Sequence, residues 1–329
     1  MKGFLTVSLL IGTSLAGCTA PAISGQGDHA GPLADAGSKL DFTCVHEVKP
    51  EPSIESDVLF QYARWLQKNN QLNNDSKINT EIERLYRIAA EHDHHKANIN
   101  LQYGTIHGHF ELNGEEHLRL SQNLIDAGVA TGYYLIGMFL KDGLAGLRAD
   151  QEMSLRFFRK AADTGNADAQ YLVGDKLDPI NIAPKIGLQM YLCAAEQGQG
   201  EAAFTLGVDL RINKKHQEAM EVFQLGVAAG NSNSASTLYR SFRDQSPTNE
   251  PYYLRLQEDQ ERADRYEKIW RILANYSYAN PKVPEINEWL EARLANIPPE
   301  KPSEALIHKL AREKGLDPVT GKPLSDVRF

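Results

Sequence analysis

Histidines form the densest cluster of side chains in this chain that could do chemistry. The run at residues 92–95 reads His-Asp-His-His and is followed by His107 and His109. Imidazole rings beside a carboxylate can bind zinc, but the spacing of these residues matches no known zinc site. The run falls in a turn between two stretches of helical periodicity, where exposure to solvent would explain it. We therefore expect solvated histidines there, with no metal site and no cofactor site.

Catalytic motifs are missing from the sequence. It contains no Gly-x-Ser-x-Gly elbow, no His-Glu-x-x-His motif and no phosphate-binding loop. The neighbouring acids Glu115 and Glu116 would diverge by about 100° on a helix, so they could not share a scissile bond. We predict no catalytic residue and a protein that is not an enzyme. A secreted hydrolase whose site is assembled from distant residues stays open as an alternative.

The residues before Cys18 have the pattern of a secretory signal. Lys2 supplies a positive charge, and residues 4–15 are apolar but too short to span a membrane. The stretch ends in Leu-Ala-Gly-Cys, which resembles a bacterial lipobox. The resemblance implies that residues 1–17 are a signal peptide and that Cys18 is lipidated. Because Thr19 and not Asp follows, it also implies the periplasmic face of the outer membrane. In the alternative, the signal is ordinary and Cys18 is incidental.

Two further cysteines, Cys44 and Cys193, would remain in an oxidising compartment. An even remainder permits a disulfide, which would close a loop of about 150 residues and could contribute about 5 kcal/mol in the chain-entropy model. Alternatively both are small buried hydrophobic residues, since Cys193 lies beside Ala194 and Ala195 in a helix-like run. Both interpretations stay open.

The charge balance limits the partners. The formal net charge is −8, and removal of residues 1–17 with Lys2 would leave −9. An acidic protein is a poor candidate for binding nucleic acid or an anionic membrane surface. We expect a protein partner and no nucleic acid.

A short phrase of small residues recurs along the chain and ends each time in Asp or Gly. The closing positions are 93, 128, 165, 198 and 230, with spacings of 35, 37, 33 and 32 residues. This period suits a pair of helices with two turns, and a closing Gly can adopt positive φ and end the first helix. In the phrase's turn, His94 occupies the position that Asn166 fills later. Packing of one helix on the next is the expected reason for Gly137, Gly174 and Gly207.

One period resembles a Sel-one-like repeat, a relative of the tetratricopeptide repeat. The match lies in residues 130–166, with Gly-Tyr-Tyr-Leu-Ile-Gly at 132–137, Lys-Asp-Gly at 141–143 and the run from Phe157 to Asn166. The following two periods match in part. The resemblance implies an all-α fold, an α-solenoid of stacked helix pairs with a cap at each end.

A broader resemblance extends beyond the repeats. Residues 42–47, 59–69 and 280–286 are similar to a group of Sel-one-like repeat lipoproteins that act as immunity proteins of type VI secretion phospholipase effectors. This implies a lipid-anchored periplasmic protein that binds and neutralises a phospholipase effector. The alternative is an outer-membrane scaffold that organises envelope or secretion proteins.

Tyrosines at helical spacing permit two interpretations. The set is Tyr133, Tyr134, Tyr171, Tyr191 and Tyr239. Tyrosine is favoured at protein interfaces, but it also packs between such helix pairs. We favour a core role for most of them, so the partner-binding residues stay unknown.

The expected organisation has five parts. They are the signal peptide at 1–17, a flexible tether and extended lead-in at 18–52, the repeat solenoid at 53–250, a C-terminal helical cap at 251–297 and a charged tail at 298–329.

Overall fold

The computed structural model of the chain describes residues 40–178, 182–244, 246, 250–276 and 299–324. Cys18 and the expected signal peptide and tether up to residue 39 therefore lie outside the described residues. Within those ranges the regular structure is helical, with thirteen α-helices and no strand. The all-α prediction is confirmed. No helix in these parts of the chain is long and apolar enough to cross a bilayer.

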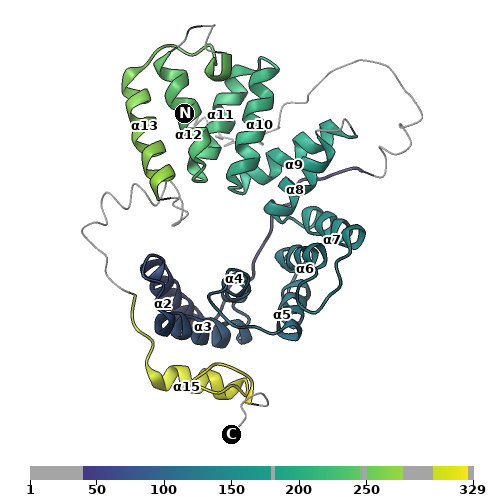
Figure 1. The fold of residues 1–329 in the computed structure, drawn as a ribbon, viewed down its shortest axis with the longest axis vertical. Helices are drawn as coiled ribbons and strands as arrows, with labels where there is room; N and C mark the ends of the chain where they lie inside the picture. The colour runs from purple at the N-terminus through teal and green to yellow at the C-terminus, as the bar shows by residue number, and fades with distance from the viewer. Residues whose placement is uncertain (1–39, 179–181, 245, 247–249, 277–298, 325–329) are drawn as a thin grey trace, which may run out of the picture. The chain divides into compact units, whose positions relative to one another are not determined.

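The helices follow one another as stacked antiparallel pairs (Figure 1). The pairs are α2 with α3, α4 with α5, α6 with α7, α8 with α9, α10 with α11 and α12 with α13. Their bounds are α2 Ile54–Asn70, α3 Ser76–Glu91, α4 His95–Ile106, α5 Gly114–Asp126, α6 Thr131–Asp142, α7 Gln151–Asp163, α8 Ala167–Leu177, α9 Pro184–Glu196, α10 Gly200–Ile212, α11 His216–Ala228, α12 Ser232–Arg243 and α13 Gln260–Asn275; a short 3-10 turn, η1, spans Glu250–Tyr252, and α15 spans Glu304–Glu313.

The repeated phrase marks the turns between pairs, as predicted. Each closing residue has positive φ: Asp93 57°, Gly128 75°, Gly165 110°, Gly198 85° and Gly230 89°. The residue after four of these turns caps the next helix through its side chain, an arrangement that satisfies a free backbone N–H. The capping residues are His94, Asn166, Gln199 and Asn231. The N-cap of α6 is Ala130, two residues after Gly128, and it offers no side-chain cap.

Glycines allow adjacent helices to approach closely, also as predicted. A Cβ on Gly137 would lie 2.8 Å from the ring of Phe158, and one on Gly207 would lie 2.6 Å from the ring of Phe223. Both rings are buried in the core between the helices of a pair. These contacts offset the helix propensity that each glycine loses.

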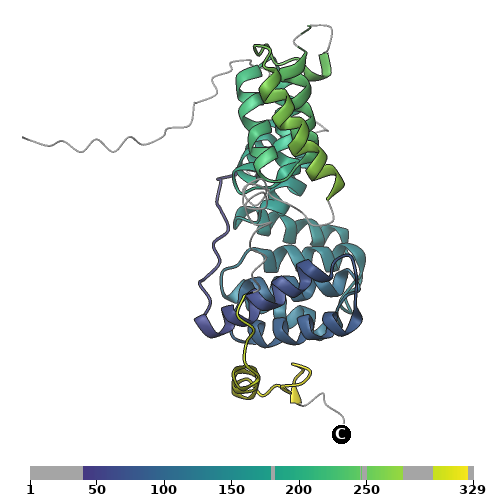
Figure 2. The same cartoon turned by 90° about the vertical axis from the view of Figure 1, so that its left-hand side faces the viewer.

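The lead-in segment, residues 41–49, is extended and attached to the solenoid at several points. Figure 2 shows it in purple, running beside the helices before it enters α2. Cys44 forms a disulfide with Cys193 of α9, with a Cα–Cα distance of 5.5 Å. Gln170 donates to the carbonyl of Val45 at 2.9 Å. The Cys44–Cys193 bond and these contacts make the segment part of the folded array.

Glu47 supplies the cap that α6 lacks. Its carboxylate accepts from the backbone N–H of Thr131 at 2.5 Å and from the Thr131 hydroxyl at 2.7 Å. The backbone N–H of Glu47 in turn donates to Gln197 at 2.9 Å, and Lys49 forms an ion pair with its carboxylate. A carboxylate at a helix N-terminus is favoured by the helix dipole as well as by the hydrogen bonds. The lead-in thus completes a repeat that is 84 residues away.

The C-terminal residues differ from the charged tail that the sequence suggests. Helix α15 packs on α3, and its side chains Ile307, Leu310 and Ala311 are at most 1% exposed. The spacing of these residues produces one apolar face, which is why the helix docks despite its many charges. Residues 299–324 therefore help to cover the first helices of the array.

Candidate protein-binding site

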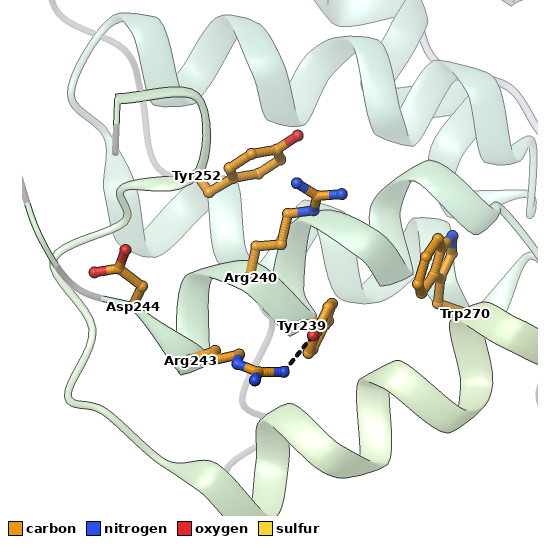
Figure 3. A pocket seen from close by; sticks show the side chains of 6 residues that line it. All are labelled: Tyr239, Arg240, Arg243, Asp244, Tyr252 and Trp270. Carbon is orange, nitrogen blue, oxygen red and sulfur yellow. Dashed lines mark hydrogen bonds between the residues drawn. The ribbon is translucent and has the colours of Figure 1, made fainter. Parts of the chain in front are cut away.

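A pocket of about 540 Å³ lies between α12, η1 and α13 (Figure 3). Three aromatic and three charged side chains line it, a mixture that is common at the energetically important centres of protein interfaces. The lining residues are Tyr239, Arg240, Arg243, Asp244, Tyr252 and Trp270.

The packing of α12 determines which of its side chains reach the pocket. Asn231 caps the helix, accepting from the backbone N–H of Ser234 at 2.7 Å. The face that carries Ala235, Leu238 and Phe242 is buried against its neighbours. Tyr239, Arg240 and Arg243 consequently project from the rest of the helix, and the two arginines lie in its last turn, where the helix dipole favours positive charge.

Helix α13 supplies the opposite wall. Asp259 caps it, accepting from the backbone N–H of Arg262 at 2.9 Å. Ala263 and Leu273 are buried, and Trp270 lies half-buried beside them. The rings of Tyr239 and Trp270 stack with centroids 6.1 Å apart and an interplanar angle of 10°. This stack holds the aromatic floor of the pocket in one conformation.

Both arginines lie over aromatic rings. The guanidinium of Arg240 is 4.7 Å from the ring centroid of Tyr252, and that of Arg243 is 5.6 Å from the ring centroid of Tyr239. Arg243 also donates a hydrogen bond to the Tyr239 hydroxyl (Figure 3). In the described parts of the chain, neither guanidinium forms an ion pair with a carboxylate. The carboxylate of Asp244 accepts from the backbone N–H of Ser246 at 2.8 Å.

Stacking leaves the polar edge of a guanidinium available. Its N–H donors lie in the plane of the group, so a ring against one face does not block them. The pocket therefore offers planar donors beside an apolar floor. This combination can bind a carboxylate from another molecule through charge-assisted hydrogen bonds.

A second pocket, on α15, is lined by two charged residues, Lys309 and Glu304, that the chain itself neutralises. Lys309 forms an ion pair with Glu55 at 2.8 Å, and Glu304 forms one with Arg84 at 2.8 Å. Both contacts join α15 to the first helices. This surface fits internal docking better than recognition of a partner.

The histidines are placed differently from the prediction. His94 is 1% exposed and His95 is 8% exposed, so the expected solvated turn is wrong for these two residues. His94 Nδ1 accepts from the backbone N–H of Ala97 at 3.1 Å, and its ring stacks on Phe60 with centroids 4.3 Å apart. Capping the helix brings the ring into the core. The predicted equivalence of His94 and Asn166 is confirmed, since both cap the helix that follows.

Burial lowers the pKa of His94, and its hydrogen bond with Asp57 only partly opposes this effect. Because Nδ1 accepts a hydrogen bond, the neutral ring carries its proton on Nε2, which lies 3.2 Å from a carboxylate oxygen of Asp57. The side chain is thus held as a neutral cap. It is not positioned to transfer a proton to a substrate.

The described residues contain one group with the composition of a metal site, formed by Cys44, His46 and Cys193. Its two sulfur atoms are joined in the disulfide. Metal binding by cysteine requires thiolates, so this group has a structural role as it stands.

The tyrosines divide between the two interpretations of the sequence. Tyr191 is 1% exposed and packs in the core. Tyr239 instead lines the pocket. Sequence reasoning missed Arg240, Arg243 and Tyr252 as a group. The only local signal is the Tyr-Arg-x-x-Arg run at the end of a helix, whereas their neighbours come from other elements.

Comparisons with known proteins bear on the segment that forms the pocket and on the whole fold. A domain of unknown function, DUF6396, matches residues 234–290 and 287–324, which include most of α12 and all of α13 and α15. Among curated proteins, none matches this chain. The residues that line the pocket therefore lie within the segment that is similar to this family.

Solved structures from Pseudomonas aeruginosa are similar over most of the fold. The protein PA5086 is 27% identical with a TM-score of 0.55, covering 75% of this chain and 92% of its own. The immunity protein PA5088 is 25% identical with a TM-score of 0.56, covering 74% and 91%. The immunity protein PA5087, at 24% identity and a TM-score of 0.56 with the same coverage, supports the fold. This chain is thus an α-solenoid of stacked helix pairs that resembles solved immunity proteins of Pseudomonas aeruginosa.

Proposed function

We propose that this protein is a lipid-anchored periplasmic immunity protein that binds and neutralises a phospholipase effector delivered by type VI secretion. The similarity to PA5088, which is itself described as an immunity protein, carries the proposal. The lipobox resemblance at Cys18 adds the anchor and the compartment. The wider resemblance of residues 42–47 and 59–69 to immunity lipoproteins adds the phospholipase.

The mechanism would be steric. Repeat solenoids present extended preformed surfaces, and a rigid surface loses little conformational entropy on binding. The disulfide between Cys44 and Cys193 and the Glu47 cap stabilise the middle of this array. Such a surface would cover the active site of the enzyme or hold it away from the bilayer.

The anchor would increase the inhibitor's concentration where it acts. A phospholipase must reach the membrane, and a tethered inhibitor occupies the same thin layer. Binding then benefits from a high effective concentration, without any additional contact. Loss of the lipid should weaken protection even if the purified proteins still bind each other.

A rescue experiment tests the proposal. Phospholipases encoded in the same genome are expressed in the periplasm with the wild-type protein, with Cys18→Ser or with an empty vector. We expect one enzyme to arrest growth alone, full rescue by the wild type and weaker rescue by Cys18→Ser. Failure of the wild type to rescue any toxic phospholipase, despite normal levels of folded protein, would favour an envelope scaffold.

A further inference from the structure

We propose that the pocket lined by Tyr239, Arg240, Arg243, Asp244, Tyr252 and Trp270 is an anchor site, through its two arginines, for an acidic side chain of a protein partner. The inference rests on the proposed function for the identity of the partner, the neutralised phospholipase. The site itself is argued from its own geometry and can be tested separately. It lies at the α12–α13 end of the described array.

The first argument is that Arg240 and Arg243 carry positive charges that have no ion-pair partner among the described residues. Arg84 and Arg87, which are also close to aromatic residues in sequence, both form ion pairs with glutamates. Arg240 and Arg243 form none among the described residues, although the chain has an excess of acids. Two neighbouring guanidiniums that form no ion pair with a carboxylate of the described residues make a site that an external carboxylate would complete.

The second argument is preorganisation. Tyr239 is held by its stack on Trp270 and by the hydrogen bond from Arg243. The backbone of Tyr252 is held by a hydrogen bond, in which its carbonyl accepts from the buried Ser241 hydroxyl at 2.6 Å. Each arginine rests on one of these held rings. Long side chains that are already ordered lose less entropy on binding than free ones.

The third argument concerns the class of partner. An anionic membrane would also supply negative groups, but the chain carries a net charge of −8, which disfavours approach to an anionic surface. Apart from Asp244, the pocket is lined by Tyr, Trp and Arg, the residue types enriched at energetic centres of protein interfaces. An acidic segment of a protein, with a Glu or Asp entering the pocket beside an apolar residue, fits both observations.

The test uses the full chain carrying Cys18→Ser, to keep it out of membranes, and the phospholipase identified by the rescue. Dissociation constants are measured for the unchanged pocket, for Arg240→Glu, for Trp270→Ala and for Arg148→Glu. Arg148 is the matched control because it is exposed, lies outside the pocket and undergoes the same charge change. Circular dichroism checks that each variant is folded.

We expect Arg240→Glu and Trp270→Ala to weaken binding by about 10- to 100-fold, as at an interface hot spot, and Arg148→Glu to change it by less than about threefold. If both pocket variants bind within about threefold of the unchanged protein, the inference is wrong. Because Arg240 is exposed, its variant remains informative even if Trp270→Ala fails to fold.

A second arm separates this site from the proposed function. The blocked peptide acetyl-Gly-Glu-Glu-Gly-Glu-Gly-amide and its Gln analogue are titrated to about 5 mM while the indole N–H resonance of Trp270, assigned with Trp270→Phe, is followed by NMR. We expect a shift with the Glu peptide, none with the Gln peptide and none in Arg240→Glu. Equal shifts with both peptides, no shift at all, or a shift only with phosphatidylglycerol vesicles would overturn the inference, whether or not a phospholipase is neutralised.

Discussion

The two ends of the helical array use arginine in opposite ways. At the α2–α3 end, Arg84 and Arg87 are buried and paired with carboxylates, one of which comes from α15. At the α12–α13 end, Arg240 and Arg243 are exposed and rest on aromatic rings. The first arrangement joins the chain to itself, whereas the second leaves donors available. An array of repeats thus has one end closed by its own C-terminal helix and one end suited to a partner.

The largest effect is expected where α15 closes the first end. Leu310 is 1% exposed and packs on the core of α3, so Leu310→Ala should lower the unfolding free energy by about 3 to 5 kcal/mol. Glu313→Ala on the exposed side of the same helix is the control and should change it by less than about 0.5 kcal/mol. Urea denaturation measures both. Equal stability of the two variants would mean that α15 does not contribute to the fold.

The arginines themselves provide the next comparison. Arg84→Ala should lower the unfolding free energy by about 2 kcal/mol, because Arg84 pairs with Glu81 and Glu304 and donates to the carbonyl of Pro318 at 2.6 Å. The exposure of Glu304 keeps this value below that of a fully buried pair. Arg240→Ala should cost less than about 0.5 kcal/mol. Thermal and urea unfolding measure both variants. Similar losses of unfolding free energy in the two variants would contradict the proposed difference between the two ends.

A smaller effect is expected in the lead-in between the two ends. Glu47→Ala removes the cap of α6 and should cost about 1 to 2 kcal/mol. Glu51→Ala in the same segment is the control, since Glu51 is exposed and caps no helix. Hydrogen exchange should show faster opening of the Thr131 amide in the first variant only. Unchanged exchange there would mean that Glu47 does not hold the helix.

The smallest effect concerns the dependence of stability on pH. His94, His95 and His117, near α4 and α5, and His216, at the start of α11, have pKa values lowered by burial. A histidine whose pKa is depressed on folding binds its proton more readily when unfolded, so stability falls as pH drops below about 6.5. Protonation of Nδ1 would also remove the cap that His94 provides for α4.

His94→Asn tests this effect, because Asn166 caps α8 in the same way. At pH of about 7.5 the variant should remain folded with a similar unfolding free energy, and its loss of stability towards pH of about 5.5 should be smaller than that of the wild type. His95, His117 and His216 should preserve part of the pH dependence. Identical slopes of unfolding free energy against pH would rule out a contribution from His94.

Sequence reasoning works where the signal is local and periodic. The closing residues of the repeated phrase, such as Gly165 and Gly198, have the positive φ that their turns require, and Gly137 makes the close helix contact expected of it. The apolar face of α15 is also visible as Ile307, Leu310 and Ala311. Its docking on α3 depends on a contact between segments more than 200 residues apart, such as that of Arg84 with Glu304.

The pocket shows the same limit at the candidate site. Tyr239 and Trp270 are 31 positions apart in the chain and meet because α12 packs on α13. Whether a tyrosine at helical spacing is core or surface depends on that packing, since Tyr191 is buried and Tyr239 is not. The exposure of such a tyrosine depends on how neighbouring helices pack, so the sequence of a single repeat does not determine it.

Inhibition of the phospholipase in a purified system tests the central claim most directly. Hydrolysis of phospholipid vesicles by the enzyme from the rescue experiment is measured against increasing amounts of the full chain carrying Cys18→Ser. The account predicts that hydrolysis falls to background as the two proteins form a complex that elutes together in gel filtration. Undiminished hydrolysis at about tenfold excess of folded protein, with no complex, would contradict it.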